Sequence, residues 1–312
     1  MPGNLKPGDF FLGGKVLVYS RLMTIVDFGD PYTRRKLGPA SDTATVVLSP
    51  DSYRNLGEIL AELTSTGMTV TKLQSFLLKE SELAELFPII GADGPYEQLV
   101  KFWTSGTSFV CELRGVSALS AAAEVVAGIR ARYATNDVEA ALWCAGASLG
   151  DFFFGSTRKF EPTATLEACS CGVIRPHAVK SGDFAAIISA ILGAGFTITA
   201  LQMLQLNKTS ASEFLEVYDG VMPNFPEMVS QLCTGPAIAL EVKRGEGKGS
   251  VGVVEAFRDF VGPWDVEMAK ELRPMTVRAK YGRNRTENAI HCTDLPEDGE
   301  AESAYFFQVL QQ

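Results

Sequence analysis

The chain has 312 residues, with 28 Lys and Arg against 37 Asp and Glu, which gives a formal net charge of -9. Its length favours two or three domains, each large enough to bury a core of its own. The acidic balance argues against a broad surface for DNA or RNA, because binding along a phosphate backbone depends on clustered basic side chains. We therefore expect no DNA or RNA partner, and only local phosphate chemistry.

Cysteine spacing and hydropathy argue against a metal-stabilised or membrane-bound protein. The six cysteines include no CxxC pair and have apolar neighbours, which predicts reduced core thiols and no metal held by the protein alone. The N-terminus has no charged start followed by an apolar run, and the most apolar stretch, residues 184–195, is too short to span a bilayer. We expect a cytoplasmic protein without a membrane partner.

Residues 1–40 are predicted to form a short β segment followed by a linker. Residues 15–19 and 23–27 have the composition of strands, and Gly-Asp-Pro turn chemistry comes after them. Residues 31–42 combine Pro and Gly with the basic run Arg-Arg-Lys, which is typical of a linker. Because an isolated hairpin is marginal in water, this segment must dock on the rest of the chain or be the remnant of a larger β domain.

Two long segments of the remaining chain repeat each other. Residues 45–78 and 170–206 both predict a strand, a Pro, an amphipathic helix, a Gly-bounded turn and a second strand, and VVLSPDSY of the first matches GVIRPHAV of the second. Further on, TSGTSFVCEL at 104–113 matches CTGPAIALEV at 233–242.

Each of these later strands is followed by a predicted helix, at 117–126 and at 251–260. The order of elements predicts an α+β protein with two tandem ferredoxin-like domains, residues 41–155 and 163–312. Each domain would be an antiparallel sheet with helices on one face.

His291 lies in a polar neighbourhood near the end of the second repeat, with Asn288, Thr293 and Asp294 close by in the sequence. Ile290 and Cys292 flank it at strand spacing, so the imidazole should leave the strand on the face opposite those two side chains. From this segment alone, a hydrogen-bonded histidine at a strand end is favoured over a nucleophile.

The second repeat resembles the nucleoside diphosphate kinase family. Its sequence NAIHCTD, residues 288–294, is similar to the family's N-x-x-H-G-S-D motif, in which the histidine carries the transferred phosphoryl group. The resemblance implies that His291 is the catalytic nucleophile and that Glu302 orients it. It also implies a nucleotide site with its Mg²⁺, formed by Arg175, Arg258, Arg278, Asn288 and Thr293.

Within that site, the resemblance implies that Arg258 and Arg278 bind the phosphates and that Asn288 binds the ribose 3′-hydroxyl. Several positions depart from the family's pattern. Its lysine before the Pro is Arg175, its base-stacking phenylalanine falls at Asn224, its tyrosine at Glu216 and a nearby threonine at Trp264. From these changes we expect altered contacts with the base and slow turnover.

The only other histidine is His177, which follows Pro176, and we interpret it as a turn histidine. The first repeat contains no histidine. In an alignment of the two repeats, the position of Asn288 corresponds to Ala140 or Ala141. The position of His291 corresponds to Trp143 or Cys144, depending on where a gap is placed. The first repeat is therefore expected to lack phosphohistidine chemistry.

Taken together, the N-terminal strands, the two repeats and the sequences RPHAV and HCTDLPEDG resemble a ciliary, two-repeat subgroup of that family. In this subgroup a β domain of the DM-ten type precedes the repeats, so residues 1–40 would be its truncated remnant. The resemblance implies a scaffold in doublet microtubules of the ciliary or flagellar axoneme, with tubulin and other microtubule inner proteins as partners. The alternative is an active kinase that transfers the γ-phosphoryl of ATP to nucleoside diphosphates through His291.

Overall fold

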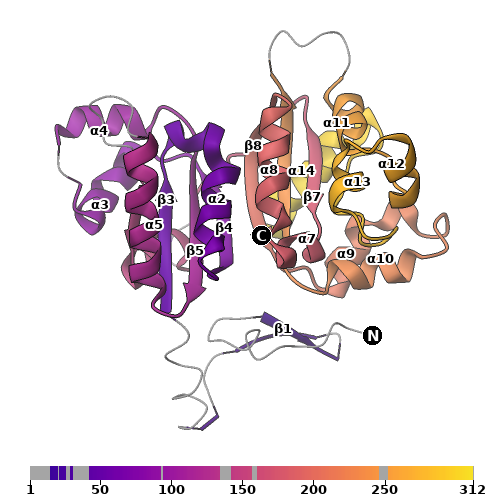
Figure 1. Cartoon of the computed structure of the whole chain (residues 1–312), viewed down its shortest axis with the longest axis horizontal. Coiled ribbons are helices and arrows are strands. Elements are labelled where there is room, and N and C mark those ends of the chain that lie inside the picture. Colours follow the sequence, from indigo (N-terminus) through magenta and orange to yellow (C-terminus); the bar gives the residue numbers. More distant parts are fainter. Residues whose placement is uncertain are drawn as a thin grey trace. The chain divides into compact units, whose positions relative to one another are not determined.

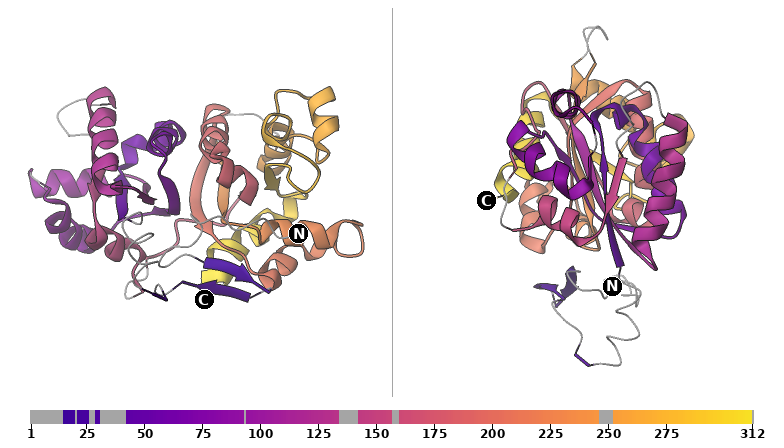
Figure 2. Two further views of the ribbon diagram at one scale, coloured as in Figure 1. Left: turned by 60° about the horizontal axis from the view of Figure 1, so that its bottom comes forward. Right: turned by 90° about the vertical axis from the view of Figure 1, so that its left-hand side faces the viewer.

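The computed structural model describes residues 15–19, 21–25, 29–30, 42–92, 94–133, 142–156, 160–245 and 252–311. The chain divides into two compact units, which are described separately (Figures 1 and 2). The N-terminal unit comprises residues 29–163, and the C-terminal unit comprises residues 164–312 together with 1–28. The domain limits 1–40, 41–155 and 163–312 stay predictions. The α+β class is confirmed, because both units combine antiparallel strands with helices.

A short hairpin opens the described chain. β1 (Lys15–Val18) pairs antiparallel with β2 (Arg21–Thr24), and Val18 lies opposite Arg21, so only two residues connect the strands. Tyr19 in this connection has a φ of 48°, in the left-handed region that tight hairpin turns require. The second strand therefore begins two residues earlier than the predicted Met23. Residues 31–41 of the predicted linker lie outside the described residues, and its last residue, Asp42, instead begins the strand Asp42–Leu48.

Four strands of the C-terminal unit pair in the order β10-β7-β9-β8, and all three pairings are antiparallel. The last strand therefore lies beside the first, as in a split βαβ arrangement. The elements are β7 (Ser170–Ile174), α7 (Pro176–Ser181), α8 (Asp183–Gly193), β8 (Phe196–Leu204), α9 (Lys208–Phe214), α10 (Phe225–Leu232), β9 (Ala237–Arg244), α11 (Val253–Val261), α12 (Val266–Leu272), α13 (Val277–Tyr281), β10 (Ile290–Cys292) and α14 (Gly299–Phe307).

The N-terminal unit has the same strand order, β6-β3-β5-β4, again with antiparallel pairings. Its elements are β3 (Asp42–Leu48), the 3-10 helix η3 (Pro50–Asn55), α2 (Leu56–Ser65), β4 (Thr69–Phe76), α3 (Glu80–Ile90), α4 (Tyr96–Trp103), β5 (Ser108–Gly115), α5 (Ala118–Tyr133), β6 (Leu142–Ala145) and α6 (Ala147–Phe154).

The predicted end of one helix in this unit is wrong. The sequence indicated a helix that stops near Val126, whereas α5 continues to Tyr133. The added turns contain Ala, Ile and Arg, which sustain a helix, and the single Gly128 within them costs only about 1 kcal/mol relative to Ala.

The prediction that helices cover only one face of the sheet is wrong for the C-terminal unit. In the C-terminal unit, Cys171 and Val173 pack in one core with residues of α9, α10 and α14. The intervening Gly172 points to the opposite face, where a Cβ would meet the ring of Phe257 from α11 at 3.2 Å. Figure 1 accordingly shows α8 in front of these strands and α14 behind them. Buried side chains on both faces make the sheet the centre of the unit.

Candidate active site around His291

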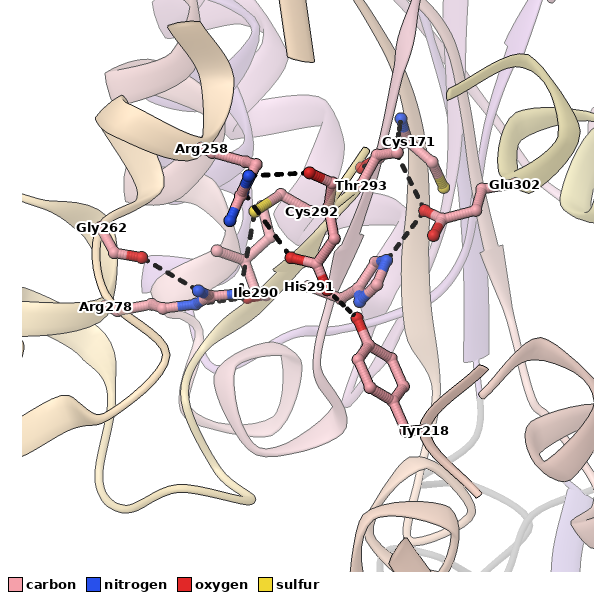
Figure 3. Close-up of polar contacts among 11 residues, drawn as sticks. Cys171, Tyr218, Arg258, Gly262, Arg278, Ile290, His291, Cys292, Thr293 and Glu302 are labelled. Carbon is pink, nitrogen blue, oxygen red and sulfur yellow. Dashed lines mark hydrogen bonds and ion pairs between the residues drawn. The ribbon is translucent and has the colours of Figure 1, made fainter. Parts of the chain in front are cut away.

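His291 lies in the middle of β10, where its ring is buried against the sheet. The predicted strand is confirmed, and so is the face: the ring contacts Phe214 of α9 at 4.9 Å between centroids, whereas Ile290 lies beside Gly172 on the other face. Nε2 lies 2.9 Å from Oε2 of Glu302 in α14 (Figure 3). Nδ1 is buried and has no hydrogen-bond partner among the described residues.

A chain of hydrogen bonds holds Glu302 in this position (Figure 3). The backbone N–H of Cys171 donates to Oγ1 of Thr293 at 2.9 Å, and that hydroxyl donates to Oε2 of Glu302 at 2.9 Å. An ionised carboxylate only accepts hydrogen bonds, so in the neutral ring Nε2 carries the hydrogen and Nδ1 keeps its lone pair. The predicted contact between Glu302 and His291 is present, and it selects one tautomer.

Two of the predicted nucleotide ligands are buried arginines. Arg278 of α13 donates to the carbonyl oxygens of Ile290 at 3.1 Å and Gly262 at 2.9 Å (Figure 3). Arg175 is fully buried and donates one hydrogen bond, of 3.3 Å, to Oε1 of Gln231, while its Nε and Nη2 have no partner in the described parts of the chain. Burial, and secondly the like charge of Arg278, lower the pKa of Arg175 to about 10, so the group stays charged at neutral pH.

The third arginine lies nearer the surface and is bound to Asp294. Arg258 of α11 donates to the carbonyl oxygen of Asp294 at 2.7 Å, and its Nε lies 3.7 Å from the carboxylate, with about half of each side chain exposed. The hydroxyl of Tyr218 donates to the same carboxylate at 2.5 Å (Figure 3). The sequence interpretation placed the family's tyrosine at Glu216 and missed Tyr218. The sequence did contain a usable signal, because a tyrosine occurs only two positions after Glu216.

Asn288 lies in the loop before β10, and its side chain is buried. Its Nδ2 donates to the carbonyl oxygen of Trp264 at 3.5 Å, while Oδ1 has no partner within the described residues. Thr293, the remaining predicted ligand, is engaged with Glu302 and Cys171. The structure therefore places Thr293 in the support of His291 rather than free for a ligand.

His177 differs from its predicted setting. It is not in a turn but in the first turn of α7, because Pro176 starts a helix there. The side chain is buried, and its Nδ1 accepts from Nε2 of Gln231 at 3.3 Å. Desolvation, and secondly the charge of Arg283, lower its pKa to about 4, which keeps the ring neutral. Gln231 thus connects His177 to Arg175.

The unpaired polar atoms of the site suit a phosphate-bearing ligand. Arg175 offers the hydrogens of Nε and Nη2, His291 offers a lone pair and Asn288 offers an amide oxygen, all of them on buried atoms without partners in the described structure. Buried charges require a counter-charge or hydrogen bonds, and guanidinium groups match phosphate oxygens in geometry. The described residues hold no group of three His, Cys, Asp or Glu that could bind a metal ion by itself, so Mg²⁺ would have to arrive with the phosphates.

The N-terminal unit lacks the corresponding pair of side chains. In β10, His291 lies opposite Val173, and in β6 the residue opposite Val47 is Trp143, which settles the gap that the sequence left open. Glu302 lies in α14, which follows β10, whereas α6, the helix that follows β6, has the sequence ASLGDFFF and contains no Glu.

These features define a class of protein: an antiparallel α+β fold in which a buried, carboxylate-bound histidine lies among arginines suited to phosphate. A sequence model of that class, "Nucleoside diphosphate kinase", matches residues 169–311. "Nucleoside diphosphate kinase homolog 7" of Mus musculus is 35% identical over 98% of this chain and 81% of its own length. The homologue of the same name from Rattus norvegicus is 34% identical with the same coverage. The chain belongs to the nucleoside diphosphate kinase family.

A shorter relative resembles less than half of the chain. "Nucleoside diphosphate kinase" of Aquifex aeolicus is 32% identical over 45% of this chain and 93% of its own length. Separately, no helix in the described part of the chain is long and apolar enough to cross a membrane.

Proposed function

We propose that the C-terminal unit carries a phosphoryl group on Nδ1 of His291, in the manner of a nucleoside diphosphate kinase. The observation that supports this most directly is the arrangement of the ring: Glu302 holds Nε2 at 2.9 Å, and Nδ1 is buried without a partner among the described residues. A neutral imidazole with one nitrogen fixed presents the lone pair of the other to an electrophile.

In the proposed reaction, Nδ1 attacks the γ-phosphorus of a nucleoside triphosphate. An N–P bond forms, the bond from phosphorus to the bridging oxygen breaks, and the nucleoside diphosphate leaves with that electron pair. A second nucleoside diphosphate then takes the group from His291 by the reverse step. Glu302 stabilises the positive charge that develops on the ring while the N–P bond forms.

The remaining residues act by positioning and neutralising charge. Arg175 and Arg278 lie at the buried end of the site and would hold phosphate oxygens, with Mg²⁺ bound by the phosphates. Arg258 must exchange Asp294 for phosphate, and Asn288 would take the ribose hydroxyl. Because Asn224 stands where the family stacks the base, we expect slow turnover, since small misplacements of a reacting group cost heavily.

Labelling of the intact chain with γ-labelled ATP tests this proposal. We expect acid-labile label on wild type and none on His291→Ala, with the modification located at residue 291 by mass spectrometry. His177→Gln, which removes the only other histidine, is the matched control and should still be labelled. Label on His291→Ala equal to that of wild type would refute the assignment.

A second function is favoured by the N-terminal unit. We infer that this unit is a second copy of the same domain, because it repeats the strand order β6-β3-β5-β4 and packs its own core. It lacks the His and Glu pair, and a fold that persists without its chemistry serves through its surfaces. We propose that the N-terminal unit serves as a scaffold bound to tubulin or to a neighbouring inner protein in the doublet microtubules of cilia or flagella. The resemblance to the ciliary two-repeat subgroup supports this proposal.

A further inference from the structure

Trp264 contacts three of the residues assigned to the nucleotide. It lies in the segment between α11 and α12, where its indole centroid is 5.3 Å from the guanidinium carbon of Arg278 and 5.7 Å from that of Arg175. Its carbonyl oxygen accepts the hydrogen bond from Nδ2 of Asn288. Tyr218 lies against the same indole, with ring centroids 5.7 Å apart.

The two arginines lack a carboxylate partner in the described structure, which makes the indole important to them. Among the described residues, Arg278 donates to carbonyl oxygens and to the sulfur of Cys292, and Arg175 donates to Gln231. Two like charges buried together need a source of negative potential, and the face of an indole ring supplies one. The indole thus takes up part of the interaction that phosphate oxygens would otherwise make.

We infer that Trp264 competes with ligand phosphates for Arg175 and Arg278, and thereby determines which phosphates the site accepts. The inference rests on the proposed function, since it concerns the same site. The indole contacts both guanidinium groups, so a ligand that displaces it must replace both contacts. A chain of two or more linked phosphates can reach both groups, whereas a single orthophosphate replaces only one contact.

The chemical class selected is therefore a di- or triphosphate. Asn288 can keep its hydrogen bond to the main-chain carbonyl of Trp264 during this displacement, because its Oδ1 is unpaired among the described residues and can accept from a sugar hydroxyl. Trp264 is a positioning residue in this scheme, acting through the two arginines.

Calorimetric titration of the full chain with pyrophosphate and with orthophosphate tests the inference without requiring phosphoryl transfer. We expect Trp264→Ala to bind pyrophosphate about tenfold more tightly than wild type, which is the size expected for two lost cation–π contacts. Trp264→Phe keeps an aromatic face and should stay within about threefold of wild type. The preference for pyrophosphate over orthophosphate should shrink in Trp264→Ala.

Two further measurements exclude a general loosening of the unit. Phe260→Ala removes a half-buried ring that packs on Phe196 and Phe257, and it should leave pyrophosphate affinity unchanged. Pyrophosphate should change the tryptophan emission of wild type but not of Trp264→Phe, in which two of the three tryptophans remain as background.

Unchanged or weaker pyrophosphate binding by Trp264→Ala would overturn the inference, as would an emission change that persists in Trp264→Phe. The result is separable from the proposed function. Absent labelling of His291 together with tighter binding by Trp264→Ala rejects only the kinase chemistry, while normal labelling with unchanged affinity rejects only the role of Trp264.

Discussion

A single hydroxyl group, that of Thr293, links Glu302 to the backbone of β7. Thr293→Val should lower the initial rate of His291 labelling about tenfold and destabilise the C-terminal unit by about 1–3 kcal/mol, because it leaves a buried N–H and a carboxylate without their partner. Thr293→Ser retains the hydroxyl and serves as the control. Labelling rate and urea denaturation measure the two effects, and equal rates for Thr293→Val and wild type would show that Glu302 needs no such support.

His177 gives the C-terminal unit a pH-dependent stability. Its pKa is about 4 in the folded chain, against the ordinary value of 6.5. Below pH 6.5 the unfolded chain binds a proton that the folded chain does not, so the free energy of unfolding falls as the pH decreases from about 6.5 to about 4. The full loss is about 3 kcal/mol.

His177→Gln lacks this titration but shares every carboxyl group with wild type. Urea denaturation at both ends of that pH window, followed through amide exchange of peptides from residues 176–193, isolates the effect of the histidine. We expect wild type to lose more stability than His177→Gln on acidification. Parallel losses in the two proteins would contradict a buried neutral imidazole.

At the scale of elements, a buried glutamate joins three parts of the C-terminal unit. Glu241 in β9 accepts hydrogen bonds from Thr199, at the irregularity in β8, and from the backbone N–H groups of Thr165 and Leu166 ahead of β7. In the N-terminal unit the corresponding Glu112 accepts from Thr71, again at a bulge, and pairs with the exposed Lys72.

The two glutamates therefore form a matched pair for mutation. Glu241→Gln should destabilise the C-terminal unit by about 3 kcal/mol, because an amide replaces a carboxylate that accepts several buried hydrogen bonds. Glu112→Gln should cost the N-terminal unit about 1 kcal/mol, since its ion pair is exposed. Urea denaturation and amide exchange of residues 164–170 would measure this, and equal costs would contradict the assigned anchoring role of Glu241.

At the scale of the whole molecule, charge bears on how a microtubule scaffold would be held. The outer surface of tubulin carries acidic tails, and a chain of net charge -9 is repelled from such a surface overall. Docking through fitted contacts is therefore expected. Exposed ion pairs are screened over about 8 Å at physiological salt, whereas buried contacts are not.

Salt extraction of isolated axonemes distinguishes these two modes of attachment. We expect the protein to stay with the doublet microtubules through a moderate-salt wash that releases proteins bound to the tubulin tails. A known tail-bound protein in the same sample is the control. Complete release by moderate salt, or a protein found only in the soluble fraction, would reject the scaffold proposal.

Local patterns in the sequence were enough to predict much of this site. The strand around His291 and the face from which its ring leaves agree with the structure, and the contact with Glu302, which the family resemblance implied, is present as well. The alternation of side chains along a strand depends only on neighbouring residues, so a short stretch of sequence predicts it. A sequence motif also keeps its residue spacing in family members that retain the surrounding helices and strands. The helix after β7 was predictable for the same reason.

Only the tertiary structure decided what depends on residues far apart in the chain. The pairing of β6 with β3 identified Trp143, rather than Cys144, as the counterpart of His291, because a shift of one residue moves every side chain to the other face of a sheet. The contact of Trp264 with two buried arginines and the helices on both faces of the C-terminal sheet likewise arise from packing. Such contacts depend on how the whole core packs, so no stretch of neighbouring residues predicts them.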